Sequence, residues 1–352
     1  MNLSPKSLFS LMLAVAASSV LGAISQADPL PGQVMKFDQE PMNQTAVAGA
    51  IYFGHDELST AYGVGNAATP PLNYDGRFMA DDFADNFNTP VVHLTWWGSY
   101  LNDTPAAPQQ HVQKFLIAFE SDVPANTATG TPSHPGCTTP GCNPVLHSEV
   151  VTLGPLSAGS GTFTETLERP APVDPVLHEA LYKYNAELSL PFKEQKDTVY
   201  WLKIAALVDV PQPLPQPVPP GTTQWGWHNR DYTIQDGLAA PVSPNVTQGE
   251  YIDGNILGQN IYHFQDDAVQ GDLRYTPGAP PPQDIVQLNM SPANYQFVNS
   301  AGVGPIDGPP GIELHSKDLA FRLYTTSIPE PTSCILLACG ALGLALARRR
   351  RS

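Results

Sequence analysis

Residues 199–208 read VYWLKIAALV, a run that is apolar or aromatic at every position except Lys203. The run is shorter than a typical buried helix, and Pro211 follows it closely. A continuous apolar run of this length is typical of a strand that is covered on both faces. The stretch therefore predicts a central strand with a layer of the protein packed on each side of it.

A second strand pattern lies just upstream. Tyr182, Tyr184, Ala186, Leu188 and Leu190 alternate with more polar residues, which is the period of a half-buried strand. Further strands are expected at residues 91–97, 114–119, 150–153 and 318–325. These segments are short and are bounded by turn-forming residues such as Gly, Pro, Asn and Asp, which favours an all-β fold.

The expected architecture is a single antiparallel β-sandwich of jelly-roll-like type, in which two sheets pack face to face over residues 28–326. The chain contains 37 prolines, and they favour long surface loops over helices. Proline-rich loops are expected at residues 211–220 and 276–284, with a third loop at 301–311.

The charge of the chain restricts its partners. The formal net charge is −16 at pH 7, and the body is more acidic still because four arginines lie in the last few residues. So acidic a body is a poor ligand for nucleic acid or anionic lipid and suits a soluble secreted protein. No nucleic-acid partner is expected.

Residues 1–27 have the order of an export signal. Lys6 precedes a mostly apolar stretch, and Ser25 and Ala27 place small residues at the two positions that signal peptidase inspects. We expect a signal helix that signal peptidase removes, so that Asp28 becomes the first residue of the exported protein.

The tail, residues 327–352, combines three elements in order. They are the motif Pro329-Glu330-Pro331, an uncharged apolar stretch over 332–347, and the basic cluster Arg348, Arg349, Arg350 and Arg351. A transmembrane helix over 332–347 would span about 24 Å, which is short of the roughly 30 Å hydrocarbon core. The arginines should stay cytoplasmic, and the prolines should keep the motif extended.

These three elements resemble the PEP-CTERM sorting signal, which an exosortase recognises. The resemblance implies an inner-membrane intermediate, cleavage by an exosortase-type membrane protease, and delivery to the cell surface or the extracellular space. It also implies an association with exopolysaccharide and biofilm. An ordinary C-terminal membrane anchor is the alternative.

Several motifs of the body carry a second resemblance. They are MADDF (79–83), VVHLTWWGSYLND (91–103), VYWLKIAAL (199–207), WGWH (225–228) and DLAFRLYTT (318–326). In this order they resemble an uncharacterised domain of secreted proteins from environmental bacteria, which is commonly followed by the same sorting tail. The resemblance implies one domain and an exported location, and it implies no mechanism.

Cys137 and Cys142 are the two cysteines of the body, in the sequence HPGCTTPGCNP. Four residues separate them in a turn-forming stretch, and an exported chain meets an oxidising compartment, so a loop disulfide is expected. A metal pair is the alternative, with His134 and His147 near in sequence, although the spacing fits no zinc motif.

The tryptophans offer a carbohydrate-binding hypothesis, because sugar rings stack on exposed indoles. Trp96 and Trp97 should point to opposite faces of a strand, so that one enters the core and the other faces outward, while Trp225 and Trp227 should share a face. Trp97, Trp225 and Trp227 are the candidates for glycan binding. The alternative is that the tryptophans fill the core.

Clustered carboxylates offer a possible calcium site. Asp81, Asp82 and Asp85 are close in sequence, with Asn86 and Asn88 beside them and Asp266 and Asp267 elsewhere. Calcium prefers such oxygen ligands, but no EF-hand loop is present, and paired aspartates in loops often only cap a turn. No other cofactor is expected.

No catalytic motif was found: HExxH, a Walker loop and GxSxG are all absent from the sequence. A carboxylate pair that meets only in space keeps a glycoside-acting enzyme open as a weaker alternative. The sequence therefore predicts an exported surface or matrix protein with a structural or adhesive role, and a carbohydrate-binding module is its main rival.

Overall fold

The computed structural model describes residues 29–326 except for 43–53, 55, 67, 102, 104–109, 127, 138–142, 171–179, 216–217, 220, 237–248, 282, 294–313 and 316. All the named elements in this part of the chain are strands, so the all-β prediction is confirmed. In the same part, no helix is long and apolar enough to cross a membrane. The expected signal helix (1–27) and the sorting tail with its transmembrane helix (332–347) lie outside the described residues.

The strands run in chain order as follows. They are β1 (Gln33–Gln39), β2 (Asp56–Leu58), β3 (Thr60–Val64), β4 (Tyr74–Phe83), β5 (Val91–Tyr100), β6 (Lys114–Val123), β7 (His134–Pro135), β8 (Val145–Leu153), β9 (Thr162–Arg169), β10 (Leu181–Phe192), β11 (Tyr200–Val210), β12 (Trp225–His228), β13 (Glu250–Ile256), β14 (Gln259–Phe264), β15 (Val269–Tyr275), β16 (Ile285–Pro292) and β17 (Phe321–Thr326). Each of the segments expected to be strands overlaps one of them.

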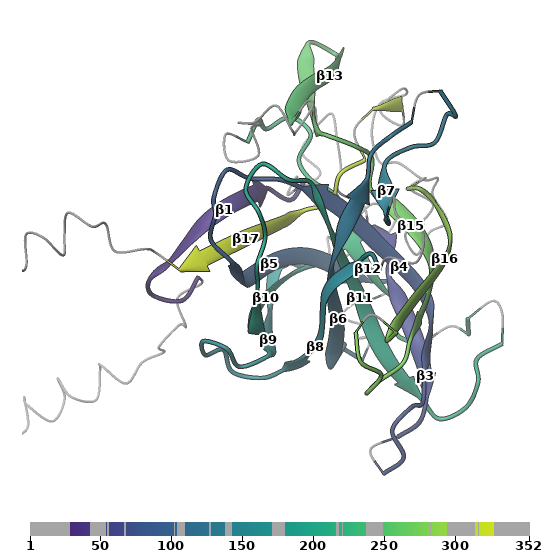
Figure 1. The fold of residues 1–352 in the computed structure, drawn as a ribbon. Coiled ribbons are helices and arrows are strands. Elements are labelled where there is room, and N and C mark those ends of the chain that lie inside the picture. Colours follow the sequence, from purple (N-terminus) through teal and green to yellow (C-terminus); the bar gives the residue numbers. More distant parts are fainter. Residues whose placement is uncertain are drawn as a thin grey trace, which may run out of the picture.

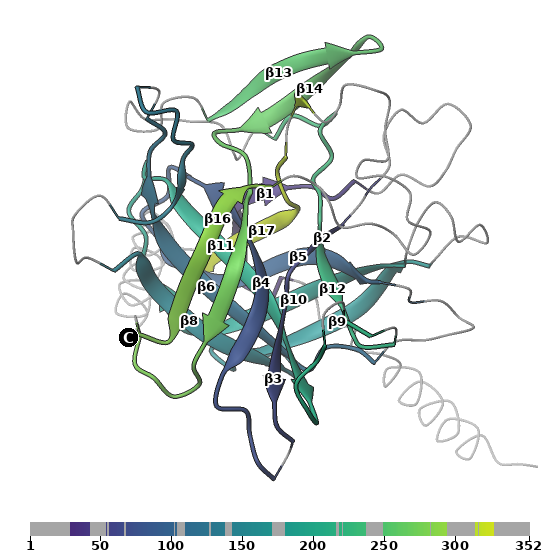
Figure 2. The ribbon, with the colours of Figure 1, turned by 90° about the vertical axis from the view of Figure 1, so that its right-hand side faces the viewer.

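Most of these strands belong to one sheet, which corrects the expected pair of separate sheets. A 15-stranded sheet has the main order β1-β17-β5-β10-β9-β8-β6-β11-β3-β4-β15-β16, and β13 and β14 form a separate hairpin. The hairpin projects from one end of the body in both views (Figures 1 and 2). The sheet is also not wholly antiparallel, because β11 pairs with β3, and β8 with β9, in parallel.

The sheet curls until it closes a circuit of hydrogen-bonded strands, and Ser59 joins the two ends of the curl. β2 pairs with β12, which pairs with β5, while β3 pairs with β11. Between β2 and β3, the Ser59 amide donates to the Trp225 carbonyl, and the Ser59 carbonyl accepts from the Ala206 amide. One short segment thus changes partner from β12 to β11 and closes the circuit, while the pairings of β10 with β9, β9 with β8 and β8 with β6 already join the strands into one sheet.

β11 is the central strand that its sequence predicts. Tyr200, Leu202, Ile204 and Ala206 belong to the main hydrophobic core inside the curl. Trp201, Ala205 and Leu207, which alternate with them, belong to a second core layer on the opposite face. Lys203, the polar exception, is buried on this second face, where it forms an ion pair with Glu120 and lies 4.2 Å from the centre of the Phe78 ring.

The second core layer is covered by the β15–β16 hairpin. Val269, Leu273 and Ile285 of these strands pack in that layer with Trp201 of β11, and Figure 2 shows the hairpin next to β4 and in front of β6 and β11. The loop between β15 and β16 is the expected proline-rich loop 276–284. The hairpin thereby forms an outer layer of the molecule and one wall of a surface groove.

β10 follows its predicted alternation for most of its length. Tyr184, Ala186 and Leu188 are buried, whereas Leu190 is 68% exposed. The pairing of β10 with β5 changes register between Glu187 and Phe192. A bulge of this kind interrupts the regular alternation of side chains, which accounts for the exposed leucine.

Candidate functional site

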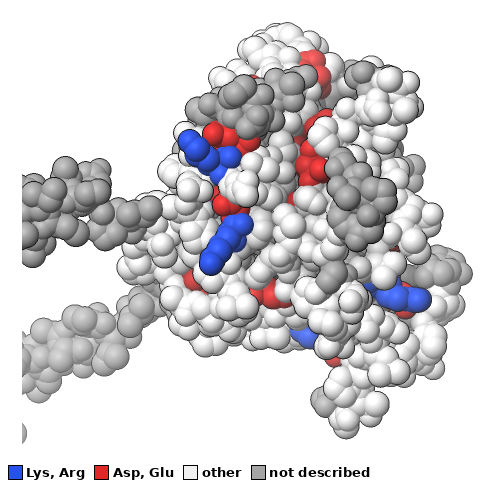
Figure 3. Space-filling view, in the orientation of Figure 1, with Lys and Arg blue, Asp and Glu red and all other residues white. Residues whose placement is uncertain are grey.

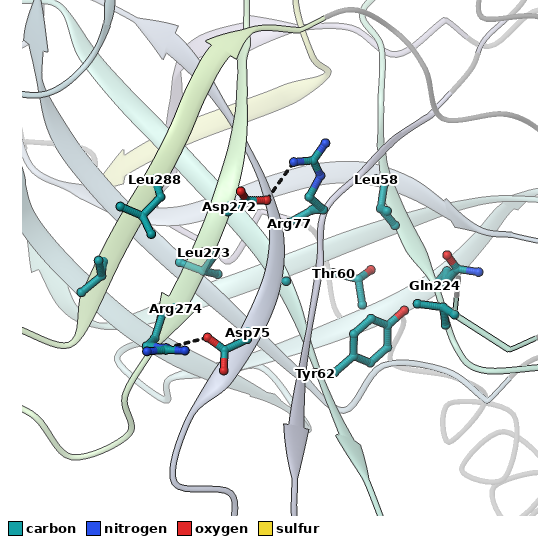
Figure 4. Close-up of a pocket in the computed structure, with 13 residues that line it drawn as sticks. Leu58, Thr60, Tyr62, Asp75, Arg77, Gln224, Asp272, Leu273, Arg274 and Leu288 are labelled. Carbon is teal, nitrogen blue, oxygen red and sulfur yellow. Dashed lines mark hydrogen bonds and ion pairs between the residues drawn. The ribbon is translucent and has the colours of Figure 1, made fainter. Parts of the chain in front are cut away.

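A groove of about 590 Å³ lies on the outer surface, where β2 and β3, β4, β15 and β16 come together. Figure 4 shows its lining, with Tyr62 and Gln224 on one side and Leu288 on the other. Concave sites that combine apolar walls with a few convergent polar groups are the usual places for ligands. This groove is therefore the candidate functional site.

The strand register arranges the side chains of the groove in two rows across the sheet. In the first row, Tyr62 of β3 lies opposite Asp75 of β4, which lies opposite Arg274 of β15 and then Val286 of β16. The second row is two residues further along each strand, about 7 Å away, and its members are Arg77, Asp272 and Leu288. Each row thus has a charged centre and an apolar end on β16.

The charged centres are two cross-strand ion pairs of opposite polarity. Arg274 Nε lies 2.6 Å from Asp75 Oδ1, and Arg77 Nη1 lies 2.8 Å from Asp272 Oδ1. β4 supplies the acid in the first pair and the base in the second. All four side chains are roughly half exposed, so solvent screens the pairs and their hydrogen-bonding groups stay accessible to a ligand.

Asp272 is held in its ionised form by its neighbours. Asn289 Nδ2 donates a hydrogen bond of 2.6 Å to Asp272 Oδ2. This bond, together with the bond and the positive charge from Arg77, lowers the pKa of Asp272. The carboxylate therefore acts as a charged hydrogen-bond acceptor over the whole neutral range.

The two ends of the rows are less polar. Val286 is 46% exposed and Leu288 is 59% exposed. At the other end the Tyr62 hydroxyl donates to the Thr223 carbonyl at 3.0 Å, and burial raises the pKa of this phenol. Tyr62 is thereby fixed against the segment before β12, and its ring forms a wall of the groove.

Gly76, in the lining of the groove, allows β3 and β4 to lie close together. A Cβ atom at this position would lie 2.2 Å from the Thr60 carbonyl oxygen and 2.5 Å from the Ala61 Cα. Any larger residue would push β3 away from β4, so the close approach of these strands requires glycine.

The cations around the groove follow the pattern of the surface seen in Figure 3. On that face the lysine and arginine side chains form a few separate spots, each beside acidic side chains, and no broad basic area is seen. The charges in the groove likewise occur as matched pairs.

The groove residues were not singled out from the sequence. The signal that could have drawn attention to them is the Asp-X-Arg pattern, which occurs as Asp75-Gly76-Arg77 and again as Asp272-Leu273-Arg274. Antiparallel pairing of two such strands in register places each aspartate opposite an arginine. The sequence gives no indication that these two stretches pair.

The tryptophans proposed for glycan binding have no accessible indole face. Trp96, Trp225 and Trp227 are 0% exposed and belong to the main core, and Trp97 is 2% exposed. Trp225 and Trp227 do share a face, as expected. The prediction that one of Trp96 and Trp97 faces outward is wrong, because both are buried.

Trp97 does lie on the opposite face from Trp96, but other residues cover it. Leu181 and Ala320 pack against its indole, and the guanidinium of Arg322 lies 5.0 Å from the ring centre. Arg322 is held there by Asp38, whose Oδ1 lies 2.6 Å from its Nε. The face expected to be open to solvent is thus closed by a neighbouring strand.

The three aspartates proposed for calcium do not converge on one site within the described residues. Asp81 and Asp82 are adjacent on β4 and are both 0% exposed, with Asp81 accepting a 2.6 Å bond from the Leu319 amide. Asp85 lies 3.3 Å from the ammonium of Lys36, and burial nevertheless raises the pKa of Asp85 to about 6. Within the described residues no three His, Cys, Asp or Glu side chains are placed to hold a metal ion. Calcium binding stays a prediction.

The remaining predicted sites fall wholly or partly outside the described residues. Cys137 follows β7, whereas Cys142 is not described, so their pairing stays a prediction. The sorting motif Pro329-Glu330-Pro331 and the four C-terminal arginines also lie outside the described part.

A second polar cluster lies at the end of β5. The ring of His111 stacks on Tyr100 with 4.6 Å between centroids, and its Nδ1 is hydrogen-bonded to Glu165. The hydroxyl of Tyr100 donates to Glu165 Oε2 at 2.5 Å, and Tyr182 donates to Asp103 Oδ2 at 2.6 Å. These groups satisfy one another, and the cavity beside them is only about 100 Å³, so the groove is the stronger candidate.

Comparison with known proteins identifies a family. Residues 35–255, more than half of the chain, match the model of a "Domain of unknown function (DUF7901)". The matched stretch includes β3 and β4 of the groove and ends before β15 and β16. No curated protein and no solved structure matches the chain. The chain belongs to the DUF7901 family.

Proposed function

We propose that this protein is an exported adhesive component of the cell surface or extracellular matrix, and that its groove binds polysaccharide. The signal-like residues 1–27 support export and removal of the signal by signal peptidase. The tail around Pro329-Glu330-Pro331 supports sorting by an exosortase-type protease, and its resemblance to the PEP-CTERM signal supports a link to exopolysaccharide and biofilm. The groove adds a surface on which such a polymer can be held.

The observation that carries the binding proposal is the pair of accessible Arg–Asp ion pairs between apolar ends. Each guanidinium is a planar donor with unused N–H groups, and each carboxylate oxygen can accept more than one bond. Sugars present hydroxyl groups that both donate and accept, together with apolar C–H surfaces. The polar centre and the apolar ends of the rows match these two kinds of surface.

The groove supports binding rather than hydrolysis. A glycosidase needs one carboxyl group with a raised pKa as its general acid. In the groove, Asp75 and Asp272 both accept hydrogen bonds from arginines, and the pKa of Asp272 is lowered. The described lining supplies no other carboxyl group, so we assign it a binding role.

Binding can be measured by affinity electrophoresis of the protein in gels that contain purified polysaccharides, followed by calorimetry with the best ligand. The Arg77→Ala and Arg274→Ala variants should each weaken binding by tenfold or more, because a hydrogen bond to a charged group contributes about 1.5–3 kcal/mol. Lys196→Ala is the matched control, since it removes an exposed cation that does not line the groove. Equal binding by all four proteins would exclude the groove.

The rival is a purely structural role in the matrix, in which the buried tryptophans only stabilise the fold. The same gels separate the two hypotheses. A protein that is retarded by no polysaccharide favours the structural role, whereas retardation that depends on Arg77 and Arg274 favours the binding role.

A further inference from the structure

The geometry of the groove points to a particular class of ligand, and this inference rests on the proposed binding function. We infer that the ligand is an uncharged polysaccharide with vicinal hydroxyl groups and alternately flipped sugar residues, as in cellulose-type glucans. We further infer that the two ion pairs contact two consecutive sugar residues, one pair for each residue.

The first step concerns one ion pair. Arg77 and Asp272 place a donor beside an acceptor, with 2.8 Å between Nη1 and Oδ1. Two neighbouring hydroxyl groups of a sugar can bridge such a pair, because one accepts from the guanidinium while the other donates to the carboxylate. Arginine has five N–H donors, so the ion pair can persist while the diol binds. Arg274 and Asp75 offer the same arrangement through Nε and Oδ1 at 2.6 Å.

The second step concerns the relation between the two pairs. Along β4 the acid Asp75 comes first and the base Arg77 second, while β15 runs antiparallel with Asp272 and Arg274 opposite them. The donor and acceptor sides are therefore exchanged from one row to the next, as Figure 4 shows for the two dashed contacts. A chain whose successive residues are turned over presents its diols in alternating orientation, which is the matching pattern.

The third step concerns charge. Each arginine is already paired with an aspartate, so the lining has no excess positive charge to attract an anionic polymer. The whole chain carries a net charge of −16, and its field repels anionic chains, most strongly at low ionic strength. Polymers of uronic acids are thus disfavoured relative to uncharged ones.

The fourth step concerns the apolar ends of the rows. Val286 and Leu288 are 46% and 59% exposed on β16, and Tyr62 forms the opposite wall. These side chains can cover the C–H faces of sugar residues that lie on either side of the ion pairs. Uncharged sugar rings suit these positions, whereas a carboxylate there would be desolvated without a partner.

Calorimetry with three probes tests the inference on the full protein. The probes are cello-oligosaccharides, the same oligosaccharides after periodate cleavage and borohydride reduction, and oligogalacturonates. The first should bind, and the second should bind at least tenfold more weakly because periodate opens the ring at the diols. The third should bind at least tenfold more weakly than the first, with the difference largest at low salt.

A charge-inverted variant provides the sharpest comparison. Arg77→Asp combined with Asp272→Arg keeps an ion pair and the net charge but gives both rows the same polarity. Its urea unfolding midpoint should stay near that of the wild type, and its affinity for cello-oligosaccharides should fall at least tenfold. The single variant Asp272→Asn, which keeps the shape, should also lose affinity.

The outcomes separate the inference from the proposed function. If oligogalacturonates bind best, if periodate-treated probes bind as well as intact ones, or if the charge-inverted protein binds normally, this inference is wrong while glycan binding stands. If none of the probes and no other polysaccharide binds, both the inference and the proposed function are wrong.

Discussion

Replacing Asp82 by asparagine tests whether a carboxyl group in the outer core layer is protonated in the folded protein. Asp82 is 0% exposed, and among the described residues neither of its side-chain oxygens has a hydrogen-bond partner. Burial is the largest cause that raises its pKa well above the ordinary value, and repulsion from Asp81, Asp266, Asp318 and Asp122 adds to it. We expect this one group to make folding strongly dependent on pH.

The sign and the size of this pH dependence of stability follow from proton linkage. When the folded-state pKa lies above the unfolded value of about 3.9, the folded protein holds a proton that the unfolded chain has released. The stabilisation is complete below about pH 3.9 and is lost as the pH rises towards the folded-state pKa, by about 1.4 kcal/mol per pH unit. The loss continues at this slope only until the pH reaches the folded-state pKa.

The Asp82→Asn protein has no proton to lose at this position. Its free energy of unfolding should therefore fall less steeply with pH, and its advantage over the wild type should grow by about 1.4 kcal/mol per pH unit. Urea unfolding at a series of pH values can be followed by the fluorescence of the tryptophans, since Trp201 lies opposite Asp82 in the β4–β11 pairing. A difference in the free energy of unfolding that is the same at every pH reflects only the replacement of a carboxyl group by an amide. It is not part of the prediction.

The matched control is Glu168→Gln, which removes an exposed carboxylate on β9. The pH profile of the Asp82→Asn protein is compared with that of this control as well as with that of the wild type. If the Asp82→Asn profile is parallel to both, Asp82 is ionised in the folded state, and the account of an unpartnered, protonated carboxyl group is refuted.

Three further predictions concern the buried ion pair and the two targeting segments. Lys203→Met should lower the free energy of unfolding by about 3–5 kcal/mol, because it leaves the buried carboxyl group of Glu120 without its ion-pair partner. Adding Glu120→Gln should recover most of that loss, and a double variant as unstable as the single one would contradict the pairing account. The intact mass of the exported protein should correspond to a chain that begins at Asp28 or within a few residues of it. A mass that includes Met1 would exclude the signal peptide. Replacing Pro329 and Pro331 by alanine should leave a cell-bound, full-length form, as judged by fractionation, whereas processing and release like the wild type would show that the Pro-Glu-Pro motif is not the recognised signal.

Some features of the fold could be predicted from the sequence because they depend on local periodicity. The apolar run around Lys203 predicts a strand covered on both faces, and β11 indeed contributes alternate side chains to two core layers. The alternation around Tyr184 predicts a half-buried strand, which is β10. The period of side chains along one strand is set by backbone geometry, so a short stretch is sufficient to reveal it.

The environment of each strand was decided by residues far away in the chain. Trp97 points away from the main core, as its position predicts, but Ala320 and Arg322 close over it. The partner change at Ser59 joins β12 to β11 and closes the circuit of strands within the single sheet. Neither contact leaves a local pattern in the sequence.

The groove shows most clearly that contacts between distant strands cannot be predicted from local sequence patterns. Arg77 and Asp272 are 195 residues apart, and Arg274 and Asp75 are 199 residues apart. The sequence by itself determined that each strand carries an aspartate and an arginine two positions apart, and hence on one face. Only the tertiary structure decided that β4 and β15 pair antiparallel in the register that sets acid against base, because register between distant strands depends on how the whole core packs.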